Sequence, residues 1–411
     1  MTQHLPAQRG QTEVDQAAPA GLRRQWLSLG VAGLALLAAA HRWWGPAAAV
    51  PAHWPWLAGS VWLYLWWFTG RNLRLHRPDP GGPVAERLGP GNLLTLARGW
   101  LIAALAGCLL APPADGLAAW LPMAWYTLAD VFDYFDGYLA RKSRQQSALG
   151  EALDLELDAL GVFAAVNLAI GYGRLPAIFL TVGLARYAFA VLIWIRQRAG
   201  LRVQPLSPSG LRRPLAGLTM GFISVTLWPI FDRPELALAG WIFFTPFMAG
   251  FVRDALVVSD SLDPRSAAYL RWRSRLRKIV LRLMPVILRL AIAGFALAQA
   301  PRYLAGSPEL VRGLGSLGLV PAPAVSTFFG GLVVLTGTAM LLGYAARFAA
   351  FVMLFPLGLT IAAVGLDPWR TIGLTATLGI LIAGSGRYSI WSPSEKLFAN
   401  RAGEHGQPRS T

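Results

Sequence analysis

Aspartate residues gather in one stretch of the chain, residues 130–158, which reads DVFDYFDGYLARKSRQQSALGEALDLELD. On a helix, Asp133 and Asp136 share one face, and Asp154 and Asp158 share one face of the following helix. A short basic turn joins the two helices, so the two carboxylate faces meet at one end of the pair. Carboxylate oxygens without His or Cys suit Mg²⁺ or Mn²⁺, and two such ions balance four carboxylates. The stretch therefore predicts a two-metal site.

Small residues and one arginine accompany these carboxylates. Gly137 and Ala140 remove side-chain bulk from the first helix, which lets a flat or phosphorylated ligand approach the backbone. Arg141 lies at the end of that helix, where its guanidinium can donate two hydrogen bonds to a phosphate. Gly150 opens the facing helix. The set suggests a nucleotide wedged between two helices, while close helix packing is the alternative interpretation of any single glycine.

The composition places this cluster in a membrane. Of the 411 residues, 55% are hydrophobic and 14% are charged, whereas soluble domains carry about 25% charged residues. A single water-soluble core is therefore excluded. An ionised Asp near the bilayer centre costs roughly 2.5–3.5 kcal/mol, so the cluster must be hydrated, paired or metal-bound. The cations nearby in the chain are too few for complete pairing.

The net charge of +16 does not indicate a nucleic-acid partner. Nucleic-acid binding needs cations on one accessible face, interleaved with stacking aromatic side chains. The Lys and Arg residues lie instead in short loops between apolar runs. Cys108 is the single cysteine and falls inside such a run, so no disulfide framework or thiolate metal site can form within one chain.

The apolar runs predict an all-α, polytopic membrane protein with about twelve transmembrane helices. The expected spans lie near residues 26–41, 54–69, 92–111, 117–139, 149–172, 175–196, 214–230, 235–257, 279–299, 322–343, 346–365 and 370–385.

The positive charges predict the orientation of these spans. With a cytoplasmic N-terminus, most of the 37 Lys and Arg residues fall in cytoplasmic segments, as the positive-inside rule requires. The carboxylate cluster then faces the cytoplasm. The first run follows Arg23 and Arg24 and is short, so a cleaved signal peptide is an alternative. The excess of Arg over Lys, with abundant Ala and Gly, is typical of a GC-rich bacterial genome, and we therefore expect a bacterial inner membrane.

Taken together, the residues of the cluster follow a known pattern. Their order is Asp133, two residues, Asp136-Gly137, two residues, Ala140-Arg141, eight residues, Gly150, three residues, Asp154, three residues and Asp158. This order resembles, without a departure, the signature of the CDP-alcohol phosphatidyltransferases. Upstream, GNLLTLAR from Gly91 to Arg98 is similar to the element that opens the first helix of that family. The resemblance covers roughly residues 70–258 and implies a six-helix bundle.

The resemblance implies transfer of a phosphatidyl group from a CDP-linked lipid, usually CDP-diacylglycerol, to an alcohol, with release of CMP. It implies that Asp133, Asp136 and Asp154 hold the metal ions, and that Asp158 completes the site and acts as general base. The residues that it places around the nucleotide are Asn92, Thr95, Gly137, Ala140, Arg141 and Gly150. Paired metal ions suit this chemistry, because they neutralise a diphosphate and hold the reacting oxygens in line.

Three arginines outside the signature are candidates for binding the acceptor. Arg186 lies some 15 Å inside its span, at a depth similar to that of Asp158. An intramembrane Arg suggests function, and pairing with an acidic neighbour is the alternative. Arg212 and Arg213 begin the next span and suit a phosphorylated acceptor, although positive-inside anchoring explains them nearly as well. The acceptor stays open, with glycerol phosphate, an inositol and serine among the candidates.

The remaining chain divides into parts with different expected roles. We expect a disordered cytoplasmic tail over 1–24, two extra transmembrane helices over 25–69, the transferase domain over 70–258, a basic linker over 259–278, a four-helix domain over 279–392 and a polar tail over 393–411. The linker contains RSAAYLRWRSRLRK, which suits either a helix lying on an anionic leaflet or a solvated loop.

The C-terminal part combines an Arg-containing first helix with the segments LLGYAARFAA and GSGRYSIW. It resembles the small DoxX-like membrane family, which implies a four-helix module with a partner, regulatory or substrate-handling role. For the transferase part, the family resemblance also suggests a homodimer.

Two other functions are compatible with acidic membrane helices. An intramembrane prenyltransferase also uses aspartate and Mg²⁺ on a diphosphate, but it needs two acidic motifs far apart in the chain. A transporter or non-catalytic scaffold is the other alternative, and a transporter predicts broken helices in repeated halves. The two halves of this chain do not resemble each other.

Overall fold

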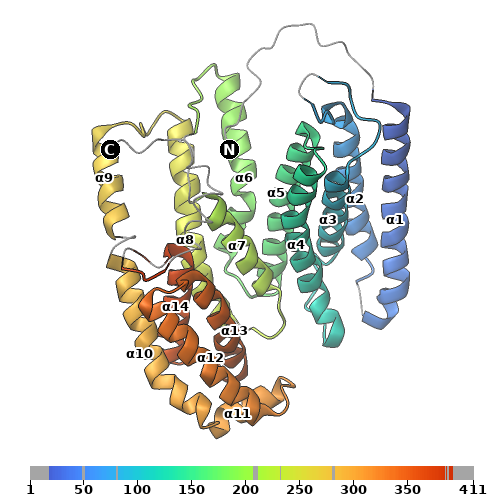
Figure 1. Cartoon of the computed structure of the whole chain (residues 1–411). Helices are drawn as coiled ribbons and strands as arrows, with labels where there is room; N and C mark the ends of the chain where they lie inside the picture. Colours follow the sequence, from blue (N-terminus) through green and yellow to red (C-terminus); the bar gives the residue numbers. More distant parts are fainter. Residues whose placement is uncertain are drawn as a thin grey trace. The chain divides into compact units, whose positions relative to one another are not determined.

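The computed structural model describes residues 18–48, 51–79, 82–206, 212–231, 233–279, 283–384, 386 and 388–391. These residues fold into α-helices and short 3₁₀ turns, with no strand among them (Figure 1). The all-α class expected from the sequence is confirmed. Of the disordered tail predicted over 1–24, residues 1–17 lie outside the described residues, whereas Ala20 already begins helix α1. The polar tail predicted over 393–411 also lies outside the described residues.

The chain forms two compact units, and the first contains residues 18–191 together with Met220–Pro229. Its helices run from blue to green in Figure 1 and are α1 (Ala20–Ala48), α2 (Trp54–Arg71), α3 (Pro90–Gly107), α4 (Leu121–Lys142), α5 (Ala148–Gly171), the first part of α6 (Leu180–Arg198) and the end of α7 (Arg212–Thr226). A proline stands in the first turn of α2, α3 and α4, where its missing N–H has no helical partner to lose.

Tryptophan side chains fasten α1 to α2. The Trp62 indole donates to the Gly30 carbonyl at 2.9 Å, and Trp26 and Trp66 each donate to the other's backbone carbonyl, at 2.8 and 3.1 Å. The Trp66 ring fills the space where a Cβ on Gly30 would lie, and the Trp62 ring does the same at Gly33. These contacts join the two additional N-terminal helices to each other.

Helix α3 is the centre of the first unit, because it packs against α2, α4 and α5. The residues 103–106 of α3 are all buried. Helices α4 and α5, by contrast, touch each other at few positions. A side chain from α3 can therefore reach both of the helices that carry the aspartates.

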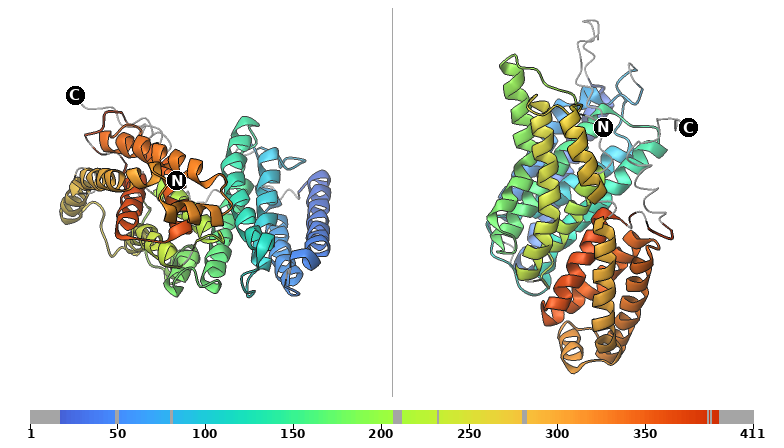
Figure 2. Two further views of the ribbon diagram at one scale, coloured as in Figure 1. Left: turned by 90° about the horizontal axis from the view of Figure 1, so that it is seen from below. Right: turned by 90° about the vertical axis from the view of Figure 1, so that its left-hand side faces the viewer.

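The second unit contains residues 192–219 and the described residues from 230 onward. Its helices beyond α7 are α8 (Arg233–Val258), α9 (Ala267–Lys278), α10 (Met284–Leu304), α11 (Pro308–Ser316), α12 (Ala322–Leu342), α13 (Ala346–Val364) and α14 (Pro368–Ala383). Helix α10 packs against α12 and α14, and α13 packs against the same two helices, which gives the four-helix bundle drawn in orange to red in Figure 2.

Of two short helices in this unit, α9 lies within the predicted basic linker, whereas α11 was not predicted. Helix α9 covers most of the basic linker, begins at the N-cap Ser266 and exposes Leu270 and Trp272. Tyr269 faces inward, and its hydroxyl accepts a hydrogen bond from Arg253 at 3.1 Å. Residues 267–278 of the linker are thus helical, and residues 259–266 are not. Helix α11, which packs on α12 and α13, has no counterpart among the predicted elements.

Every predicted span coincides with a helix, but fewer helices qualify as spans by length and hydropathy. Among the described residues, five are long and apolar enough to cross a membrane: Ala177–Arg198, Leu236–Val258, Met284–Leu304, Ala322–Leu342 and Ala346–Val364. The helices that carry the aspartates are not among them. The total of about twelve spans stays a prediction.

Candidate active site

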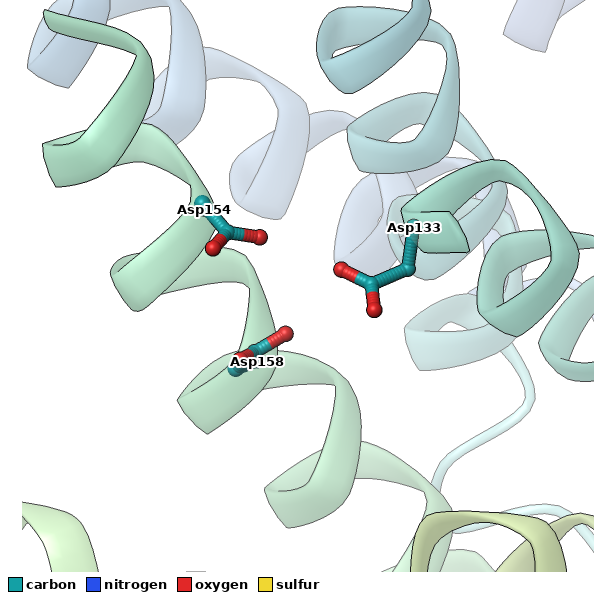
Figure 3. A group of neighbouring side chains, drawn as sticks. All are labelled: Asp133, Asp154 and Asp158. Atoms are coloured by element: carbon teal, nitrogen blue, oxygen red, sulfur yellow. The ribbon is translucent and has the colours of Figure 1, made fainter. Parts of the chain in front are cut away.

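The aspartates of α4 and α5 face each other, as Figure 3 shows for Asp133, Asp154 and Asp158. One carboxylate oxygen from each of the three lies within 4.8 Å of the others. Their side chains are 35%, 43% and 39% exposed, so a ligand can reach them. The structure therefore brings together three of the four carboxylates predicted to form the metal site.

Arg98 of α3 lies among these carboxylates, and its side chain is 2% exposed. Its Nη1 is 2.6 Å from Oδ1 of Asp133 and 2.9 Å from Oδ1 of Asp154, while Nη2 donates to Oδ1 of Asp158. A single guanidinium thus connects α4 with α5 from a third helix. Because one positive charge faces several carboxylates, the cluster keeps a net negative charge.

Asp136 lies beside this group and is more deeply buried. Its Oδ2 accepts a hydrogen bond from the Thr95 hydroxyl at 2.9 Å and is 3.9 Å from Nη1 of Arg98. Thr95 also donates to the Gly91 carbonyl of its own helix. Asp136 and Thr95, which the sequence assigns to the metal and to the nucleotide, are therefore direct partners across α3 and α4.

The small residues predicted to surround the nucleotide lie where helices approach closely. A Cβ on Gly150 would be 2.8 Å from Oδ1 of Asn92, so the absence of a side chain on α5 leaves room for that amide. On α4, the Arg141 guanidinium lies over Gly137, with Nη1 3.2 Å from the position of a Cβ there. Gly137 directly follows Asp136 on α4, and Gly150 lies one turn before Asp154 on α5, so both pairs adjoin aspartates of the cluster in the chain.

Ala140 has a different neighbour. A Cβ on Gly91 would meet the Ala140 Cβ at 2.8 Å and the Asp136 carbonyl at 3.0 Å. Gly91 and Ala140 therefore set the close approach of α3 to α4. The small-residue packing that the sequence offers as an alternative is thus present at this position.

A histidine that sequence reasoning did not single out contacts Asn92. His76 is fully buried, and its Nδ1 is 3.2 Å from the side-chain amide nitrogen of Asn92 and 3.1 Å from the Ser147 hydroxyl. Its Nε2 is 2.9 Å from the Arg87 carbonyl. Burial lowers the pKa of His76, which favours the neutral imidazole.

The structure describes only one of the three arginine side chains that are predicted to bind the acceptor substrate. Arg186 is half-buried on α6, where the charges of Glu156 and Asp158 act on it, and no salt bridge of Arg186 within 4 Å is found among the described residues. Glu156 instead accepts a hydrogen bond from the Tyr64 hydroxyl at 2.6 Å. Arg212 and Arg213 begin α7, and their side chains lie outside the described part of the structure.

The residues present fit a divalent cation. Asp133, Asp154 and Asp158 offer hard oxygen donors that converge within coordinating reach of one another and are partly open, which is the donor chemistry that Mg²⁺ and Mn²⁺ prefer. Arg98 neutralises only part of their charge. Asp136 is close to the same guanidinium and can complete the set.

Helices that bring carboxylates and a buried guanidinium to one partly open site have the parts of a phosphoryl-transfer enzyme. Comparison with known families specifies the class, because residues 90–252 match the family model of the CDP-alcohol phosphatidyltransferases. This segment is therefore similar to the CDP-alcohol phosphatidyltransferases, and the match supports the enzyme class that the sequence predicts for it. Together with the apolar helices, the match identifies an integral membrane protein.

One curated relative matches part of the chain. It is the CDP-diacylglycerol–glycerol-3-phosphate 3-phosphatidyltransferase of Cereibacter sphaeroides, which is 33% identical over 97 residues. The match spans 23% of this chain and 44% of the relative. No solved structure matches the chain. The DoxX-like character of the C-terminal helices stays a prediction.

Proposed function

We propose that this protein transfers a phosphatidyl group from CDP-diacylglycerol, or a related CDP-lipid, to an alcohol and releases CMP. The observation that carries the proposal is the convergence of Asp133, Asp154 and Asp158 on Arg98 within the matched segment. The site would face the cytoplasm of a bacterial inner membrane, as the positive-inside rule predicts.

The four aspartates would hold one or two divalent ions, with Mg²⁺ and Mn²⁺ as the candidates. A bound ion neutralises the diphosphate and stabilises the charge that develops on the departing CMP. Arg98 would keep the carboxylate helices at a fixed separation before the substrate arrives. Its charge also reduces the repulsion among carboxylates at an interior site.

The nucleotide would lie beside the partly exposed carboxylates of the cluster. Arg141, which is exposed at the end of α4, would donate to a phosphate of the CDP group. Gly137 leaves room for the Arg141 guanidinium, and Gly150 leaves room for the Asn92 amide. These groups would hold the diphosphate near the aspartates.

Asp158 would act as the general base. Arg98 holds its Oδ1, so Oδ2 is the atom proposed to accept the proton of the acceptor hydroxyl. The acceptor oxygen would then form a bond to the phosphorus that bears diacylglycerol, as the bond from that phosphorus to the oxygen of CMP breaks. The proton passes from Asp158 to solvent, which restores the carboxylate.

Glycerol 3-phosphate is the first acceptor to test, because the partial relative carries that substrate in its name. Arg186 lies in the electrostatic neighbourhood of Asp158 and has no close ion pair among the described residues, so it is the proposed partner of a phosphate on the acceptor or the lipid. Arg212 and Arg213 remain candidates for the same role.

The test is CMP release by the purified protein with CDP-diacylglycerol and Mg²⁺ or Mn²⁺, with glycerol 3-phosphate, inositol, inositol phosphate and serine supplied separately. Mass measurement of the lipid identifies each product. Release that needs one acceptor would establish the reaction and name the acceptor. A folded protein that binds no CDP-lipid would contradict the proposal.

A further inference from the structure

The connector between α2 and α3 is folded against the site, although it precedes the matched segment. Its Leu73, Val84 and Leu88 are buried in one apolar cluster with residues of α1, α3 and α5, among them Leu22 and Leu149. Burying such side chains is worth roughly 1.5–3 kcal/mol each. The connector is therefore part of the first unit's core.

Polar contacts join described residues of this connector to one another and to α1. The Leu88 amide donates to Oε1 of Gln25 on α1 at 2.7 Å, and the Ala85 amide donates to the His76 carbonyl at 2.9 Å. The His76 backbone is thus joined to Ala85, and Leu88 is joined to α1. Helix α1 therefore contacts the loop that carries His76.

The contacts of His76 define its tautomer. A backbone carbonyl only accepts hydrogen bonds, so Nε2, which faces the Arg87 carbonyl, carries the proton. In the neutral ring Nδ1 is then an acceptor, and it receives hydrogen bonds from the Asn92 amide and the Ser147 hydroxyl. None of the three partners carries a charge.

Both groups held by Nδ1 adjoin Gly150. Because the Asn92 nitrogen donates to His76, its Oδ1 is directed toward α5, 2.8 Å from the position of a Cβ on Gly150. Ser147 is the N-cap of α5, and its hydroxyl oxygen accepts from the Gly150 amide at 3.3 Å. One imidazole therefore fixes an amide on α3 and the first turn of α5 together.

We propose that His76 is a positioning residue for the CDP group, and that it acts by orienting Asn92 and the start of α5. The inference rests on the proposed function, since it assigns His76 to the nucleotide end of that site. The inference also assigns a role in substrate binding to the N-terminal helices, because α1 and α2 adjoin the loop that carries His76.

Two substitutions separate positioning from simple filling of space. Asn places a carbonyl oxygen near the position of Nδ1, so His76→Asn keeps the acceptor and loses the contact with Arg87. Gln reaches the position of Nε2, so His76→Gln keeps the contact with Arg87 and loses the acceptor. Both variants lose one side of the imidazole, and we expect similar decreases in melting temperature.

The expected result is a split in substrate affinity. His76→Gln should raise KM for CDP-diacylglycerol, and the dissociation constant for CDP, about tenfold, with a smaller change in kcat, whereas His76→Asn should stay near wild type. In the Asn92→Ala variant, His76→Gln should raise KM and the dissociation constant little further, because the amide that His76 orients is already absent. His53→Gln is the matched control, since the His53 imidazole contacts one carbonyl, that of Leu109, beyond the other end of α2.

Equal effects of the two His76 variants, in proportion to their loss of stability, would overturn the inference. Additive effects of His76→Gln and Asn92→Ala would overturn it as well. CDP binding keeps the two proposals distinguishable: a wild-type protein that binds CDP but releases no CMP from any CDP-lipid contradicts the proposed function, while the CDP affinities still decide the role of His76. A wild-type protein that binds no CDP contradicts both.

Discussion

Arg98 on α3 and Asp158 on α5 form a direct ion pair, in which Nη2 donates to Oδ1. The other terminal nitrogen of the same guanidinium contacts Asp133 and Asp154. Helices α4 and α5 have few contacts of their own, so Arg98 is a principal connection between the two carboxylate faces. The site therefore depends on a residue from a helix that carries none of the aspartates.

Replacing Arg98 tests this connection. Arg98→Gln leaves the carboxylates to repel one another, and we expect a loss of stability below the roughly 3–5 kcal/mol of a broken buried pair, because the three carboxylates are partly exposed. Thermal unfolding in detergent measures it. Mn²⁺ should raise the melting temperature of the variant more than that of wild type, since a cation replaces the missing charge. Equal Mn²⁺ responses would show that the carboxylates do not share one site.

The general base can be tested apart from binding. Asp158→Asn removes the proposed proton acceptor and nearly preserves shape, so we expect turnover to fall by about 10²–10⁴ with CDP binding retained. Glu151→Gln, on the exposed first turn of the same helix, is the control and should leave turnover unchanged. Wild-type turnover in Asp158→Asn would remove Asp158 as the base.

The glycine on α5 should matter for the nucleotide. Gly150→Ala puts a Cβ within 2.8 Å of Oδ1 of Asn92 and must displace that amide, so we expect KM for the CDP-lipid to rise about tenfold. Gly171→Ala is a matched change on the same helix, where nothing lies within 4 Å of the new atom. Equal KM values for the two variants would show that Asn92 plays no part in binding.

The tryptophan contacts predict a stability effect far from the chemistry. Gly30→Ala places a Cβ in the Trp66 ring, and overpacking of this kind costs about 1–3 kcal/mol. Gly59→Ala on α2 meets no atom within 4 Å and should be neutral or slightly stabilising. Melting temperatures of the two variants, measured side by side, decide this point. No difference between them would mean that α1 does not pack as described.

The sequence is sufficient to predict the helices and the meeting of the aspartates, because apolar runs set the helices and spacing sets their faces. The positions of Asp154 and Asp158 opposite Asp133 follow from these rules. Helix α11 has no such signal, since its nine residues are too short to show as an apolar run.

The spacing of residues along the chain does not predict the contacts of Arg98 and His76. Arg98 lies in an apolar run, where a charged side chain needs a partner of opposite charge. The run therefore predicts an ion pair for Arg98, but it does not show which acidic residues form that pair. His76 lies in a Pro-, Gly- and Arg-rich connector that resembles a solvated loop. The connector packs against α1 and α5, which are distant from it in the chain, and no local pattern predicts this packing.

The central claim is that the carboxylate cluster transfers a phosphatidyl group. The most direct test follows CMP and lipid product together, with wild type and Asp154→Asn given CDP-diacylglycerol, glycerol 3-phosphate and Mn²⁺. We predict that wild type forms one new phospholipid for each CMP released, that EDTA stops both, and that Asp154→Asn forms neither. Product formation by Asp154→Asn at the wild-type rate would contradict the account.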